Sequence, residues 1–228
     1  MASESAETLT IRVPGTPFPI KFQDWVHDRV YATLEFANAD ATTLDVFSAG
    51  PGQIIPGGGR TLTHVDTNLT RAGTSGLDPG NQMLVYSIQT FIKAMGYTAG
   101  TAALTDMRAQ PTLALWHDAQ DKIFFEFKYN QKRRSAGLLT RYPQGGGIHV
   151  VTNTTGQEIA SNGIPSPRDA VAFVMPLWLK PNIGFNGYFE PVVALDVDDT
   201  FVYDGTSYTA GYFDLQVSLE GLKQVPVT

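Results

Sequence analysis

The chain has 228 residues, a formal net charge of −6 and no cysteine. The lack of cysteine excludes a disulfide framework and any thiolate metal ligand or nucleophile, and the acidic balance argues against wrapping of nucleic acid over a basic surface. Hydrophobic residues make up 43% of the chain, with 22 glycines and 14 prolines, a composition that favours one large all-β domain with a well-packed core.

Residues 1–23 are predicted to form an extended arm. The segment is polar and then carries Pro14, Pro17 and Pro19, and prolines this close disfavour a helix. It shows no signal peptide, and no apolar window of the chain approaches the ~20 residues that span a bilayer. We expect a soluble product made inside the cell, whose arm is either a frayed terminus or laid over a neighbouring subunit.

The next elements are two strands and a loop. Tyr31–Phe36 alternates between polar and apolar residues and predicts a half-buried strand. Thr42–Phe47 is a second short strand candidate, and Ser48–Arg60 is so rich in glycine and proline that it must be a loop. A phosphate-binding loop would need Gly-Lys-Ser/Thr at its end, whereas Arg60 and Thr61 follow Gly59 here.

The middle of the chain predicts a long strand, a helix and a strand pair. Met83–Met95 is rich in β-branched and aromatic residues, which favours a strand. Thr101–Gln110 has a capping threonine, good helix formers and a stop at Pro111, so we predict a helix that covers one end of the fold. Thr112–Trp116 and Lys122–Tyr129 flank a polar turn and predict strand, turn and strand.

Asn130–Ser135 is the only concentrated basic run, and it contains Lys132, Arg133 and Arg134. A solvated turn is the usual role of such a cluster. The alternative interpretation is a contact with phosphate or with lipid headgroups. These three residues are the only candidate site that the sequence offers.

The stretch Val171–Leu195 contains two apolar, aromatic-rich runs separated by a Pro/Asn/Gly break, and it predicts a central hairpin. Because proline cannot donate to a ladder, Pro176 and Pro191 must each lie at a sheet edge, a bulge or a strand end. Trp178 and Phe185 are predicted core residues, since both sit in the apolar runs.

Shorter signals complete the pattern. Ile148–Thr152 predicts a strand, Asn153–Arg168 a polar loop, Asp204-Gly205 a hairpin turn and Gly211–Leu219 the last strand. With about ten strand candidates and no linker that would divide the chain, we predict a single β-sandwich.

Candidate chemistry is sparse. The four histidines, His27, His64, His117 and His149, lack metal-ligand spacing. Asp196, Asp198 and Asp199 do not form a calcium loop, because its required glycine and glutamate are replaced by Phe201 and Ser207. We predict no catalytic residue, no metal ligand, no cofactor and no small-molecule substrate.

Three segments together resemble the jelly-roll coat proteins of tailless icosahedral bacteriophages. They are TNLTRAGTSGLDPGNQMLVYSIQTFI, KYNQKRRSAGLLTRYPQGGGI and NGIPSPRDAVAFVMPLWLKPNIGF. The resemblance covers roughly residues 60 to 220, by pattern and order. It implies a single jelly roll of eight strands and two Greek keys over residues 24–228, whereas many such viruses fuse two jelly rolls in one chain.

The resemblance also implies a function. The chain would be a virion structural protein, made in the host cytoplasm, that self-assembles as a capsid tile around the genome. Its partners would be copies of itself in a capsomer and other capsid proteins, with a contact to an internal membrane or to the genome left open. The main tile, one of a pair of tiles and a vertex protein all remain compatible with this length.

Two other classes share the architecture. A carbohydrate-binding or adhesin-like module would present aromatic residues on one exposed face of the sandwich. A cupin-type enzyme would need clustered histidines and a carboxylate for a metal, which the sequence does not display. Assembly into closed shells or capsomers would distinguish a tile from both.

Overall fold

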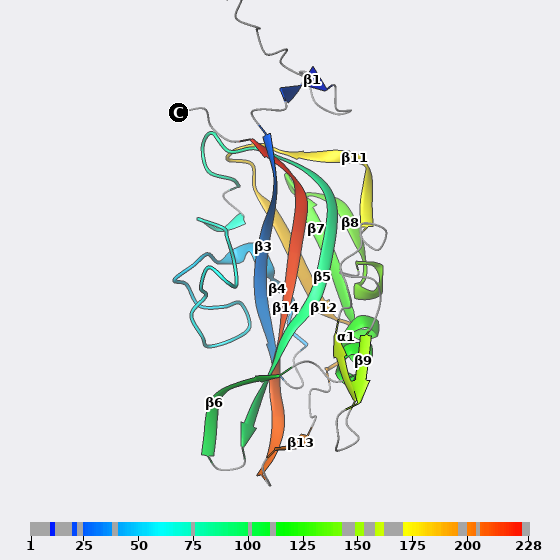
Figure 1. Ribbon diagram of the computed structural model, residues 1–228. Helices are drawn as coiled ribbons and strands as arrows, with labels where there is room; N and C mark the ends of the chain where they lie inside the picture. Colours follow the sequence, from blue (N-terminus) through cyan, green and yellow to red (C-terminus); the bar gives the residue numbers. More distant parts are fainter. Residues whose placement is uncertain are drawn as a thin grey trace, which may run out of the picture.

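The chain folds into two antiparallel β-sheets that pack face to face, as the computed structural model shows (Figure 1). The structure describes residues 10–11, 20–21, 25–37, 41–73, 76–99, 102–109, 113–142, 149–152, 158–161, 171–195, 200–203 and 206–224. Within these ranges strands dominate and α1 is the one α-helix. The predicted all-β sandwich with one short helix is therefore confirmed.

The first sheet is built on two long strands at its centre. In order across the sheet it contains β3 (Trp25–Ala37), β14 (Thr206–Gln224), β5 (Met83–Ala99) and β11 (Val171–Leu179). Beyond the ends of β3 and β11, β13 (Thr200–Tyr203) pairs with β14 and β6 (Ala102–Ala109) pairs with β5. β5 and β14 consequently extend past the sandwich as a projecting four-stranded sheet (Figure 1).

The second sheet is shorter. It contains, in order, β4 (Leu44–Asp45), β12 (Phe185–Pro191), β7 (Ile123–Tyr129) and β8 (Lys132–Leu138). The remaining elements are the 3-10 turns η2 (Val46–Ser48) and η4 (Leu139–Arg141), the helix α1 (Leu113–Lys122), and two small ladders, β1 (Thr10–Ile11) with β2 (Ile20–Lys21) and β9 (His149–Thr152) with β10 (Glu158–Ser161).

The strand order identifies the fold as a jelly roll. When the eight principal strands (β3, β4, β5, β7, β8, β11, β12 and β14) are numbered one to eight along the chain, the sheets read 1-8-3-6 and 2-7-4-5. The chain crosses between the sheets at every connection except the β7–β8 hairpin. This double Greek-key arrangement is that of the eight-stranded jelly roll.

The core lies between the two sheets and is rich in phenylalanine. On β7 every second residue is buried, and the exposed fraction of Phe125 and Phe127 is 0%. Phe125 stacks on Phe189 of the neighbouring strand with 4.6 Å between ring centroids, and Phe47 meets Phe185 edge to face at 5.0 Å. Such aromatic pairs add to the stability that burial of their area provides.

The predicted hairpin over Val171–Leu195 is wrong in its pairing. Its two strands exist, but β11 pairs with β5 in the first sheet and β12 pairs with β4 and β7 in the second. The break carries the chain across the sandwich, with Asn182 in the left-handed region at φ 58° and its N–H donated to Leu77 O at 3.0 Å. A turn signal alone does not reveal whether the next strand stays in the same sheet.

The proline positions are confirmed. Pro176 lies in the edge strand β11 between Ala172 and Leu177, where the register with β5 shifts, and Pro191 is the last residue of β12. Phe185 is fully buried as predicted, but Trp178 is only half-buried. The predicted place of Trp178 in the core is therefore wrong.

The predicted helix Thr101–Gln110 is wrong as well. Residues Ala102–Ala109 form β6, which pairs with the end of β5. The helix is α1, which starts at Leu113 within the predicted strand Thr112–Trp116. Pro111 precedes that start by two residues, and proline favours the first turn of a helix as much as it ends one.

Other local predictions have mixed outcomes. The strands predicted at Met83–Met95 and Gly211–Leu219 are confirmed within β5 and β14. The strand Lys122–Tyr129 is confirmed from Ile123 onward as β7, and Ile148–Thr152 from His149 onward as β9, with Ile148 outside the described residues. Thr42–Phe47 divides into β4 and η2, and the polar loop Asn153–Arg168 contains β10. Asp204-Gly205 and Asp196, Asp198 and Asp199 lie outside the described residues, although β13 and β14 do pair at Tyr203 and Thr206, as the predicted hairpin requires.

Candidate functional site

The three predicted site residues lie on the β7–β8 hairpin at one end of the sandwich. Asn130 and Gln131 form its turn with φ of 50° and 59°, as in the two-residue turns whose twist matches paired strands. Lys132, Arg133 and Arg134 follow in β8, and all three are exposed. A register shift places Phe127 opposite Ser135 and Lys128 opposite Arg133, so Arg134 is the extra residue of a β-bulge.

The cations of this hairpin differ in their partners. Glu126 pairs with Arg133 and, at 2.9 Å, with Lys128. Partial burial raises the pKa of Glu126, but hydrogen bonds from Lys128 and Arg133 outweigh it, so its pKa lies below the usual value. Among the described residues, no carboxylate lies within 4.0 Å of the side-chain nitrogens of Lys132 or Arg134, so neither has an ion-pair partner in that part of the chain.

The end of β11 joins the hairpin through a tyrosine. The backbone N–H of Lys180 donates to the hydroxyl of Tyr129 at 2.9 Å, and the guanidinium of Arg134 lies 5.9 Å from the centroid of the Tyr129 ring. The ammonium of Lys180 lies 4.7 Å from the centroid of the Trp178 ring, whose indole N–H donates to Gln82 Oε1 at 2.8 Å. These contacts fix the backbone of Lys180 to Tyr129, the last residue of β7, which pairs with Lys132.

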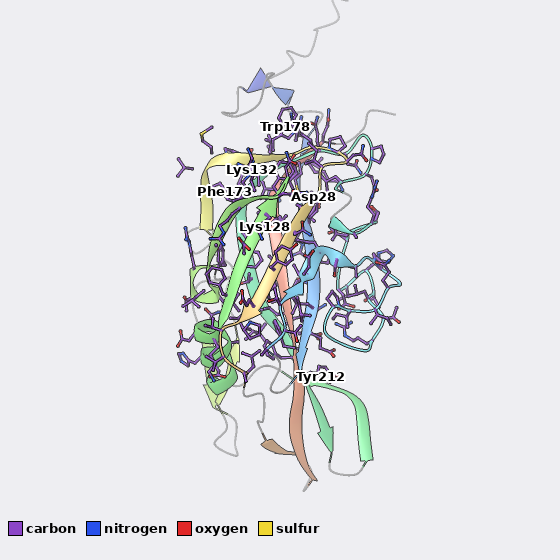
Figure 2. The ribbon with its side chains drawn as sticks, turned by 180° about the vertical axis from the view of Figure 1, so that it is seen from behind. Asp28, Lys128, Lys132, Phe173, Trp178 and Tyr212 are labelled. Carbon is purple, nitrogen blue, oxygen red and sulfur yellow. The ribbon has the colours of Figure 1, made fainter. Side chains whose placement is uncertain are left out.

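An exposed apolar pair lies on the same strand. Val174 is 100% exposed and Met175 59% exposed, in the part of β11 that leaves the ladder with β5 just before Pro176. Figure 2 shows Phe173, Trp178 and Lys132 at one end of the sandwich, opposite Tyr212. We call this surface the basic end. It comprises Lys128, Lys132, Arg133, Arg134, Val174, Met175, Trp178 and Lys180.

A second charged cluster is buried under the glycine-rich loop. The guanidinium of Arg60 donates two hydrogen bonds to Asp66, of 2.8 and 3.0 Å, and one to Asp214 at 2.9 Å. Lys93 reaches Asp66 at 2.8 Å, and Glu35 lies 3.8 Å from Arg60 Nε. Burial raises the pKa of Asp66, but hydrogen bonds from Arg60, Lys93 and Thr63 more than offset it and hold that pKa far below its usual value.

This cluster fastens the loop to the outer face of the first sheet. Asp66 O accepts a bond from Thr33 on β3 at 2.8 Å, and the N–H of Glu35 donates to Pro56 O at 2.9 Å. Gly57 sits at φ 83°, where an added Cβ would lie 2.0 Å from Glu35 O. Ile55 is buried. The Ser48–Arg60 loop is thus packed by contacts within the chain.

Sequence reasoning found the basic hairpin but missed both the β11 side of the basic end and the Arg60 cluster. Lys180 is far from the hairpin in sequence and meets it only through the fold. Arg60 appeared only as a mismatch to a phosphate-binding loop. The one signal for the Arg60 cluster was that Glu35 and Asp214 are carboxylates within long strands. The alternating pattern of those strands assigned both side chains to solvent.

No cluster of metal-ligating side chains emerges in the described part of the chain. His27, His64 and His117 are exposed on three separate segments, and no three histidine or carboxylate side chains there are grouped to hold a metal ion. Within the same ranges no helix is both long and apolar enough to cross a membrane.

Comparisons with protein-family models, with curated proteins and with solved structures find no match for this chain.

Proposed function

We propose that the chain is a capsid tile, a virion structural protein that assembles with copies of itself and with other capsid proteins into an icosahedral shell around the genome. The observation that carries the proposal is the jelly-roll strand order, 1-8-3-6 against 2-7-4-5. Viral capsid domains use this fold, and so do lectins and cupins. Since one fold serves several functions, features beyond the strand order must support the choice.

One supporting feature is the protected sheet edge. β11 is an edge strand of the first sheet, and its middle leaves the ladder at a bulge that ends in Pro176. A proline and a bulge both hinder the addition of another strand. A shell protein at high local concentration needs this protection, because uncontrolled edge pairing yields fibres in place of closed shells.

Another supporting feature is the projecting sheet of β13, β14, β5 and β6 (Figure 1). A sheet is most stable when a second layer covers one of its faces. A neighbouring subunit in a shell would supply such a layer. We also propose that the arm at residues 1–23 contacts neighbouring subunits in the shell.

The second candidate is a glycan-binding module, and one observation favours it. The outer face of the second sheet has a depression of about 240 Å³ lined by Thr43, Phe124, Glu126, Lys128, Tyr188 and Glu190. An aromatic ring beside carboxylates suits the stacking and hydrogen bonding that sugars require. However, the ammonium of Lys128 lies 4.8 Å from the centroid of the Tyr188 ring and occupies its face.

Assembly and glycan binding decide between these candidates. For a tile, light scattering and electron microscopy of the purified chain should show capsomers or closed symmetric particles, and the chain should be a dominant band of purified virus particles. A small monomer that binds a glycan array, and loses that binding in Tyr188→Ala, would replace the tile by the glycan-binding module. A chain that stays monomeric under every condition would overturn the proposal that it is a capsid tile.

A further inference from the structure

The basic end concentrates positive charge in a chain that is acidic overall. It carries five cations, and among the described residues the carboxylate in ion pairs with them is Glu126, which pairs with Lys128 and Arg133. Lys132, Arg134 and Lys180 are exposed and keep their charges toward solvent. The formal net charge of the whole chain is −6, so this surface opposes the overall charge and favours an anionic partner.

The same end presents aliphatic side chains to water. Val174 is 100% exposed and Met175 59% exposed, and Phe173 and Trp178 flank them on β11 (Figure 2). A second exposed apolar pair, Val192 (64%) and Val193 (59%), follows the opposite end of the second sheet. The neighbouring cation there, Lys122, is paired with Asp118. The basic end combines exposed aliphatic residues with three cations that form no ion pair among the residues that the structure describes.

This combination selects one partner among the anionic candidates. Single-stranded nucleic acid stacks its bases on exposed aromatic faces, but Tyr129 is buried and the ring of Trp178 is covered by Lys180. A lipid bilayer offers both headgroup phosphates for cations and an acyl boundary for aliphatic side chains.

We propose that the basic end docks on the surface of an anionic lipid bilayer. Lys132, Arg134 and Lys180 would contact headgroup phosphates, while Val174 and Met175 enter the boundary of the acyl region. The contact is peripheral, and it does not depend on whether the chain assembles into a shell. Vesicle binding and assembly are separate measurements, so the failure of one leaves the other standing.

The test is co-flotation of the full chain with vesicles of phosphatidylcholine alone or mixed with phosphatidylglycerol. We expect binding to the anionic vesicles, and its loss as salt is raised. The variant Lys132→Gln/Arg134→Gln/Lys180→Gln should bind about 100-fold more weakly, at about fivefold for each cation. Arg141→Gln, which removes an exposed cation beyond the other end of β8, is the control and should bind as the parent does.

A second pair of variants tests the aliphatic contact. Val174→Ser/Met175→Ser should weaken binding to anionic vesicles several-fold, whereas Val192→Ser/Val193→Ser should leave it unchanged. All these positions are exposed, so melting temperatures close to the parent will show that the variants remain folded.

Several outcomes would overturn the proposal. They are equal binding to neutral and anionic vesicles, no vesicle binding, or full binding by the triple variant. Competition by inorganic phosphate at low concentration would indicate a phosphate site, and preference for duplex DNA over vesicles would indicate a nucleic-acid surface. Either result would replace the bilayer as the partner.

Discussion

The two sheets of the sandwich have the same kind of inner face and different outer faces. On β3, five consecutive residues from Ala32 to Phe36 are buried, because the loop that contains Arg60 lies over the outer side. On β7, buried and half-exposed residues alternate along the whole strand. Where this loop covers it, the outer face of the first sheet is therefore an internal polar layer, whereas that of the second sheet is surface.

This difference shows what strand patterning can and cannot reveal. The alternation at Tyr31–Phe36 predicted a half-buried strand, and the sequence pattern is real. Its polar side is nonetheless buried, since Thr33 and Glu35 face Asp66 and Arg60 of the loop. A polar face on a strand indicates that no apolar layer packs on that face. It does not show that the face is exposed, because a layer of buried ion pairs can also cover polar side chains.

The largest expected effect concerns the shared inner face. Phe125→Ala should lower the free energy of unfolding by about 3–5 kcal/mol, because a fully buried ring is removed from the core. The adjacent residue, Phe124, lies on the open outer face and is half-buried. Phe124→Ala is the matched control and should cost clearly less in the same urea titration. Equal losses would show that the second sheet is covered on both faces.

The covered outer face should depend on its ion pairs. Arg60→Met should destabilise the fold by about 2–4 kcal/mol, because it leaves Asp66 and Asp214 buried without their shared guanidinium. Lys128→Met removes a cation from the open face of the second sheet and should change stability by about 1 kcal/mol or less. If both variants melt alike, the Arg60 cluster contributes no more than a surface ion pair.

Because the loop lies close to β3, substitution of one glycine in the loop should destabilise the fold. Gly57→Ala should cost about 1–3 kcal/mol, since the residue has φ 83° and its Cβ would meet Glu35 O. An added Cβ at Gly59 meets no atom within 4 Å, so Gly59→Ala should be close to neutral. Denaturant melts of both variants make the comparison, and a neutral Gly57→Ala would show that the loop does not lie against β3.

The smallest effect is a difference in pH dependence. The folded pKa of Asp66 is held below its unfolded value, so the stability that its charge contributes is present above about pH 4 and lost as the pH falls toward the folded value. Urea melts between pH 7 and pH 3 should show this loss. The variant Asp66→Asn should make the free energy of unfolding depend less on pH over the same range. An unchanged slope in that variant would place the acid sensitivity elsewhere.

The sequence was informative about strands and weak on their partners. Met83–Met95 and Gly211–Leu219 were found because long runs of β-branched and aromatic residues have few alternatives. The pairing of β11 and β12 was missed because the break at Pro181 is compatible both with a hairpin and with a crossing between sheets. α1 was missed because Pro111 was interpreted as the end of one helix and not as the start of another.

The candidate site was predictable only where it is local in sequence. Lys132, Arg133 and Arg134 form one run and were identified together. Lys180 joins them only because Tyr129 bonds its backbone across the end of the sandwich, and the Arg60–Asp214 pair spans 154 residues. Contacts of this range depend on the strand order, which no single-segment pattern encodes.

The most direct test of the capsid proposal is electron microscopy of the full chain beside a variant that lacks residues 1–23. We predict that the full chain forms closed symmetric particles or capsomers, and that the shortened chain keeps a near-parental melting temperature but stays small. Loss of folding on truncation would make the arm part of the core, and normal assembly without it would make the arm dispensable. A full chain that stays monomeric under every condition would contradict the proposal that this jelly roll is a shell tile.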